Sequence, residues 1–109
     1  MSIELPAIIA AYFDADRSGS ADRVARCFTA EAVVTDEGET HTGREAIRQW
    51  KAGASRTYTY TADPRSVAKD GPRTLVTSRV SGNFPGSPID LTYAFRLAGD
   101  AIAALEITS

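Results

Sequence analysis

The stretch Ser55-Arg56-Thr57-Tyr58-Thr59-Tyr60-Thr61 decides the fold, because threonine and tyrosine alternate along it. Such alternation is typical of a strand, in which successive side chains point to opposite faces of a sheet. Before residue 55 the apolar residues recur with helical spacing, and after it they alternate. We therefore predict an α+β fold in which helices come first and the strands of a mainly antiparallel sheet follow.

Three helices are predicted before residue 55. The first spans about residues 4–17, and helical spacing gives it a buried face made of Leu5, Ile8, Ile9, Tyr12 and Phe13. Gly19 can end this helix, and Ser20 can cap a second one. The buried face of the second helix would hold Val24, Cys27 and Phe28. Thr42 and Glu45 have the spacing of a capping box that opens a third helix. Its apolar stripe contains Ala46, Ile47, Trp50 and Ala54.

Strand patterns account for most of the remaining chain. A short strand is predicted at residues 33–36, between the second and third helices. Further strands are predicted at residues 57–67, 74–81, 89–97 and 102–108. Pro64 indicates an edge strand or a bulge, because proline cannot donate a hydrogen bond to a neighbouring strand. The expected architecture is a curved sheet wrapped by three N-terminal helices into a cone-shaped pocket.

Aromatic and apolar side chains are available for every wall of such a cone. We expect the pocket to bind a small apolar or aromatic molecule, because ligand sites are mostly apolar with a few placed polar groups. The residues expected to line it are Phe13, Phe28, Trp50, Val80, Phe84, Tyr93 and Phe95, together with Tyr12 and either Tyr58 or Tyr60.

Composition narrows the classes of protein that the chain can be. Its 109 residues are enough for one domain. The formal net charge of −2 argues against a nucleic-acid partner, which requires clustered basic residues. We expect no contact with a membrane, since no apolar run reaches the roughly 18 residues of a membrane-spanning helix and residues 1–6 do not resemble a signal peptide. Cys27 is the only cysteine, so a reducing cytoplasm is the expected location.

Three segments carry a resemblance to a known family. They are Ile9-Ala10-Ala11-Tyr12-Phe13, then residues 27–36 (CFTAEAVVTD), then residues 42–50 (TGREAIRQW). Together they resemble the nuclear transport factor 2-like superfamily, which includes the ketosteroid isomerases and the SnoaL-like polyketide cyclases. The resemblance covers nearly the whole chain and implies one SnoaL-like domain over residues 1–109. This fold hosts enzymes, ligand binders and association domains, so the resemblance alone leaves the function open.

Asp36 is the leading candidate for a catalytic residue. It ends a strand of valines, so its carboxylate is expected at the mouth of the cavity. The resemblance to the isomerases implies that an aspartate here abstracts a proton next to a carbonyl group. The alternative is that Asp36 only caps the turn formed by Glu37 and Gly38.

Tyr12, Tyr93 and His41 are the other candidates for chemistry. The resemblance implies that Tyr12 donates a hydrogen bond to the developing oxyanion, although a buried core tyrosine is the alternative. Where the isomerases carry a protonated acid on a late strand, this chain has Tyr93, while Asp90 faces the other way. His41 can exchange protons near neutral pH, or it can play a structural part before the third helix.

The sequence leaves three functions open. The first is an isomerase or cyclase in which Asp36 is the base and Tyr12, with Tyr93 or His41, stabilises the enolate. The second is a binder of an apolar metabolite without chemistry, and the third is a dimeric association domain. We expect no cofactor and no metal site, because a lone histidine and scattered carboxylates lack the spacing of metal ligands. A homodimer is expected, because neither face of the predicted strand at residues 57–61 is charged.

Overall fold

The structure is a computed structural model that describes residues 4–57 and 59–109. The described residues form three helices and one six-stranded sheet, which confirms the predicted α+β class. In chain order the elements are α1 (Ala7–Ser18), α2 (Ala21–Arg26), β1 (Phe28–Asp36), β2 (Glu39–Thr42), α3 (Arg44–Thr57), β3 (Tyr60–Asp70), β4 (Arg73–Gly82), β5 (Ile89–Ala98) and β6 (Ala101–Thr108).

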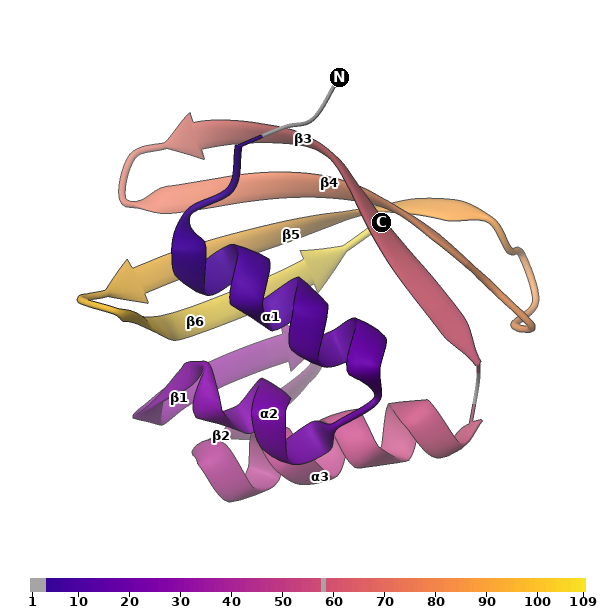
Figure 1. The fold of residues 1–109 in the computed structure, drawn as a ribbon, viewed down its shortest axis with the longest axis horizontal. Coiled ribbons are helices and arrows are strands. Elements are labelled where there is room, and N and C mark those ends of the chain that lie inside the picture. Colours follow the sequence, from indigo (N-terminus) through magenta and orange to yellow (C-terminus); the bar gives the residue numbers. More distant parts are fainter. Residues whose placement is uncertain (1–3, 58) are drawn as a thin grey trace.

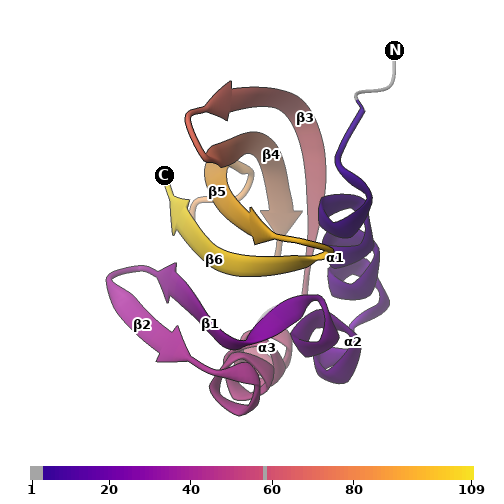
Figure 2. The same cartoon turned by 90° about the vertical axis from the view of Figure 1, so that its left-hand side faces the viewer.

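The sheet is strongly curved, and its strands lie in the order β2-β1-β6-β5-β4-β3. All neighbouring strands are antiparallel except β1 and β6, which run parallel. Helix α1 lies across the strands of the second half of the chain, and α3 lies beside β1 and β2 (Figures 1 and 2). The curved sheet and the helices therefore enclose an interior, as the predicted cone requires.

The boundary between α1 and α2 follows the sequence signals. Gly19 has a φ of 77°, a left-handed conformation that glycine adopts without strain, and it ends α1. Ser20 then caps α2, because its side-chain oxygen accepts a hydrogen bond of 3.2 Å from the backbone N–H of Arg23. Helix α3 begins after Gly43 rather than after Thr42, so the predicted capping box does not set its start. The Glu45 carboxylate instead binds Arg48 and Gln49 on the same helix.

Two local predictions were wrong because long-range pairing overrides the local pattern. Phe28 was expected on the second helix, but it is the first residue of β1, which is longer than predicted and pairs with both β2 and β6. The predicted strand at residues 57–67 begins only at Tyr60, since α3 continues to Thr57 and Tyr60 is the first residue opposite β4. Tyr58 lies outside the described residues. The predicted irregularity at Pro64 is present as a register shift in the edge strand β3.

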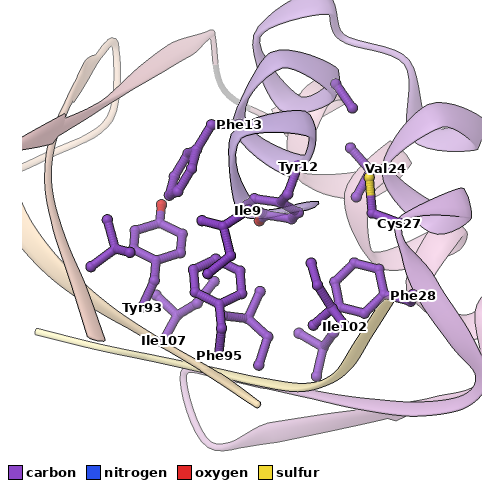
Figure 3. Packing of buried hydrophobic residues seen from close by; sticks show 14 of the residues in the cluster. Ile9, Tyr12, Phe13, Val24, Cys27, Phe28, Tyr93, Phe95, Ile102 and Ile107 are labelled. Carbon is purple, nitrogen blue, oxygen red and sulfur yellow. The ribbon is translucent and has the colours of Figure 1, made fainter. Parts of the chain in front are cut away.

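The core lies between α1 and the concave face of β5 and β6. Figure 3 shows Tyr12 and Phe13 reaching from α1 towards Tyr93 and Phe95 on β5. Their rings meet edge to face, with centroids 5.5 Å apart for Tyr12 and Phe95 and 5.2 Å apart for Phe13 and Tyr93. None of the helices in residues 4–57 and 59–109 combines the length and apolar character needed to span a bilayer.

Candidate functional site

A cavity of about 400 Å³ opens where α3 and the loop after β4 meet the ends of β1, β5 and β6. Its volume lies in the range of about 300–1,000 Å³ that small-molecule sites occupy. Its wall is mostly apolar and consists of Asp36, Glu37, Ala54, Tyr60, Val80, Phe84, Pro85, Ile89, Leu91, Tyr93 and Ile107. An apolar molecule with one polar end matches such a wall.

Asp36 places a carboxylate in this wall. It is the last residue of β1 and is half-buried, and its Oδ2 accepts a hydrogen bond of 3.0 Å from the indole Nε1–H of Trp50 on α3. Glu37, with a φ of 54°, and Gly38, with a φ of 79°, form the turn that follows. The Asp36 side chain is thus bound to the helix rather than to the turn that it was alternatively expected to cap.

Two tyrosines line the same cavity as Asp36. They are Tyr60 on β3 and Tyr93 on β5. Burial raises the pKa of both phenols well above the ordinary value for tyrosine, and the negative charge of Asp16 raises both further. Both groups therefore stay protonated at physiological pH, and a protonated phenol can donate a hydrogen bond to an oxygen atom in its reach.

Tyr12 lies one layer behind the cavity wall. Its ring is fully buried and packs against Tyr93, with ring centroids 6.4 Å apart. Its hydroxyl has no hydrogen-bond partner within the described residues, and burial raises its pKa well above the ordinary value. Tyr12 therefore supports the Tyr93 ring directly, while Tyr93 itself faces the cavity.

The other predicted site residues fall into three places. Val80, Phe84 and Tyr93 line the cavity with Asp36. Trp50 and His41 lie beside Asp36, since Trp50 binds it and the His41 ring centroid is 5.9 Å from the indole. Phe13, Phe28 and Phe95 belong to the core cluster and are not among the residues that form the wall of this cavity.

A buried polar network joins the site to the core, and the sequence analysis missed it. Asp16 Oδ1 lies 2.9 Å from Lys51 Nζ and accepts a hydrogen bond of 2.9 Å from the Tyr60 hydroxyl. Lys51 also donates to the Tyr60 hydroxyl at 2.9 Å. The sequence does contain a signal for this network. Asp16 continues the apolar stripe of Ile9 and Tyr12 on the first helix. Lys51 lies between Ile47 and Ala54 on the apolar stripe of α3. Charges of opposite sign on two apolar stripes indicate a buried ion pair.

The same part of the chain, residues 4–57 and 59–109, contains no group of three or more histidine, cysteine or carboxylate side chains that could hold a metal ion. The polar groups in the cavity wall include the Asp36 carboxylate, which the Trp50 indole binds, and the phenols of Tyr60 and Tyr93.

Comparisons with known proteins agree with this architecture. The SnoaL-like domain family matches residues 9–105. A protein of Sinorhizobium meliloti with a provisional assignment as a polyketide cyclase is 44% identical over 95% of each chain, with a TM-score of 0.91. No protein of curated function matches the chain.

Two more distant structures share the fold. A protein of Catenulispora acidiphila with a ketosteroid isomerase-like fold, crystallised in complex with trimethylamine, is 21% identical over 97% of this chain and 87% of its own, with a TM-score of 0.86. TerC, crystallised with polyporic acid, is 14% identical over 94% of this chain and 88% of its own, with a TM-score of 0.80. At these identities the likeness establishes the fold alone.

Proposed function

Since the chain belongs to the SnoaL-like domain family, we propose that it binds a small apolar or aromatic carbonyl compound and moves a proton at the carbon next to the carbonyl. One observation carries the proposal. The Asp36 carboxylate lies in the wall of a mostly apolar cavity of about 400 Å³ and is held there by Trp50. A fixed carboxylate beside an apolar site is suited to act as a general base.

The proposed reaction begins when Asp36 accepts the proton from the α-carbon. The electron pair of the broken C–H bond forms the double bond of an enolate, and the carbonyl π electrons move to oxygen. Tyr93 donates a hydrogen bond to that oxygen, which stabilises the developing charge. Return of the proton to a different carbon gives an isomer. Attack of the enolate carbon on a second carbonyl of the same molecule closes a ring instead, and the alkoxide formed from that carbonyl takes the proton back from Asp36.

The remaining predicted residues support these two. Tyr12 packs behind the Tyr93 ring. His41 packs near the Trp50 ring, whose N–H binds Asp36. The similarity to the Sinorhizobium meliloti protein supports a cyclase-like activity, and the complexes of the two distant relatives support a small organic ligand.

Exchange of α-protons with solvent tests the proposed function. Bicyclic aromatic ketones such as β-tetralone are incubated with the protein in D₂O, and loss of the α-proton signal is followed by NMR. We expect the protein to accelerate exchange over buffer for ketones that it binds, and Tyr93→Phe to slow it. Absence of both binding and acceleration across a panel of such ketones would contradict the proposal.

A second function is a carrier or sensor that binds the same kind of molecule without converting it. The hydrogen bond from Trp50 to Asp36 favours this reading, because an anchored carboxylate can also serve as a fixed polar contact for a ligand. Saturable binding of a ketone without accelerated exchange, in the experiment above, is the result that this function predicts.

We also propose that the protein forms a homodimer through the outer face of its sheet. Register places Thr77 opposite Thr92, and Leu75 opposite Ala94, on that face. These four outward side chains of β4 and β5 are uncharged, and two ion pairs flank them, Arg79 with Asp90 and Arg73 with Glu106. A sheet face with a strip of uncharged side chains between balanced ion pairs can pack against its own copy across a two-fold axis.

A further inference from the structure

Lys51 on α3 is a buried lysine whose contacts lead to the cavity wall. Its side chain is 5% exposed, and its ammonium group lies 2.9 Å both from Asp16 Oδ1 and from the Tyr60 hydroxyl. The same ammonium lies 4.3 Å from the centroid of the Trp50 ring. A buried ammonium is costly unless charged and polar groups surround it, and here three residues from three elements, Asp16, Tyr60 and Trp50, hold Lys51 in place.

Trp50 connects this ammonium to the carboxylate of the site. One face of the indole meets Lys51, and its Nε1–H donates to Asp36 at 3.0 Å. A cation over the face of an indole is attracted by the π electrons and restricts the rotation of the ring. It also draws electron density from the ring, which makes the N–H a stronger donor to an anionic acceptor.

We infer that Lys51 is a positioning residue for Asp36, and that it acts through the Trp50 indole. Asp16 and Tyr60 hold the ammonium against the indole, and the indole in turn fixes the carboxylate in the cavity wall. Because Tyr60 also lines the cavity, the same network orients a second wall residue. The catalytic meaning of this inference rests on the proposed function of Asp36, whereas the structural coupling does not.

The indole N–H resonance tests the coupling without any ligand. Trp50 is the only tryptophan, so the full-length protein labelled with ¹⁵N gives one indole signal. Asp36→Asn defines how far the signal moves when the anionic acceptor is lost. We expect Lys51→Met, which keeps the length of the side chain without its charge, to move the indole proton upfield towards that position and to speed its exchange with solvent. Lys51→Arg, which keeps the charge, should restore most of the shift.

If Lys51→Met alone does not fold, a triple variant is used for the same test. Asp16→Leu with Lys51→Met and Tyr60→Phe removes the whole network, so no buried charge is left unpaired. We expect this folded variant to show the same upfield shift. An indole signal that stays at its wild-type position in either folded variant would overturn the inference. Failure of every variant without the charge to fold would also overturn it, since Lys51 would then serve the fold rather than the position of Asp36.

The proposed function and this inference can fail separately. If no ketone exchanges protons but the indole signal responds as expected, Lys51 positions Asp36 as a polar contact for a ligand and not as a base. If exchange is catalysed and the indole signal does not respond to Lys51→Met, Asp36 is held by Trp50 without help from the ammonium.

Discussion

Asp16 on α1 and Lys51 on α3 form an ion pair 2.9 Å long in which the two side chains are only 4% and 5% exposed. In every other ion pair of residues 4–57 and 59–109 both side chains are at least 41% exposed, whereas this buried pair ties two helices to Tyr60 in the wall of the cavity. Removal of one charge from such a pair leaves the other buried without compensation, which is strongly destabilising.

Asp16→Asn should therefore lower the free energy of unfolding by about 3 kcal/mol or more. Asp14 on the same helix provides a matched control, because its ion pair with Arg17 is exposed to solvent. Asp14→Asn should change the free energy of unfolding by about 0.5 kcal/mol or less. Urea denaturation measures both values. Similar losses in the two variants would mean that the Asp16 pair is not buried in solution.

Gly82 is a position where the packing admits no side chain. A Cβ built there would lie 2.2 Å from the carbonyl oxygen of Thr59 and 2.8 Å from the Cα of Tyr60, and both are backbone atoms that cannot move independently. Gly82→Ala should therefore destabilise the protein by about 2 kcal/mol or more and separate the start of β3 from β4.

Gly53→Ala is the control for this substitution. Gly53 lies within α3, and a Cβ there meets no atom within 4 Å. Alanine has the higher helix propensity, so this variant should gain about 0.5–1 kcal/mol of stability. Thermal denaturation of the two variants compares them directly, and a Gly82→Ala protein as stable as the wild type would contradict the close approach of residues 59 and 82.

The buried tyrosines predict a loss of stability in alkali. The pKa values of Tyr12, Tyr60 and Tyr93 are all raised, with burial as the largest cause. Above about pH 10 these phenols ionise in the unfolded chain but not in the folded one, so the unfolded state binds fewer protons and the free energy of unfolding falls as pH rises. Each of the three contributes up to about 1.4 kcal/mol per pH unit.

Phenolate absorbance and circular dichroism, recorded through the same alkaline titration, check this expectation. Most of the phenolate should appear together with the loss of structure. Full ionisation of all tyrosines while the circular dichroism remains native would show that the three phenols are accessible to solvent.

The proposed dimer is tested by a charge placed at the centre of the outer sheet face. Sedimentation equilibrium should give the wild type about twice its chain mass of 11.6 kDa. Thr92→Lys should give a single chain, because two like charges would face each other across the two-fold axis. Gln49→Lys on the exposed surface of α3 should leave the mass unchanged. A wild type that sediments as one chain at micromolar concentration excludes the dimer.

Local signals in the sequence predicted the parts of the fold that depend on neighbouring residues. Gly19 and Ser20 marked a helix end and a helix start, and Pro64 marked the irregular edge strand, because each acts through its own backbone. Asp36 was found for the same reason, as it ends the strand that contains the buried Val34. Phe28 was misplaced, since its strand exists only through pairing with β6 at the other end of the chain.

The polar half of the site was not predictable from apolar periodicity. The buried face of a helix is recognised by its apolar residues, so a charged residue on that face is taken for an interruption of the pattern. Asp16 and Lys51 each interrupt a stripe, and the packing of α1 against α2 and of α2 against α3 brings the two charges together. The role of Trp50 was also hidden, because the partner of its N–H lies on another element.

The proton-transfer role of Asp36 is the central claim, and the rate of α-proton exchange in a bound ketone tests it most directly. The measurement compares Asp36→Asn with Glu37→Gln, because the neighbouring carboxylate also lies in the cavity wall. With β-tetralone at saturation, Asp36→Asn should slow the exchange about 100-fold or more while binding persists, and Glu37→Gln should exchange at nearly the wild-type rate. Exchange that is equally fast in Asp36→Asn and in the wild type would contradict the claim.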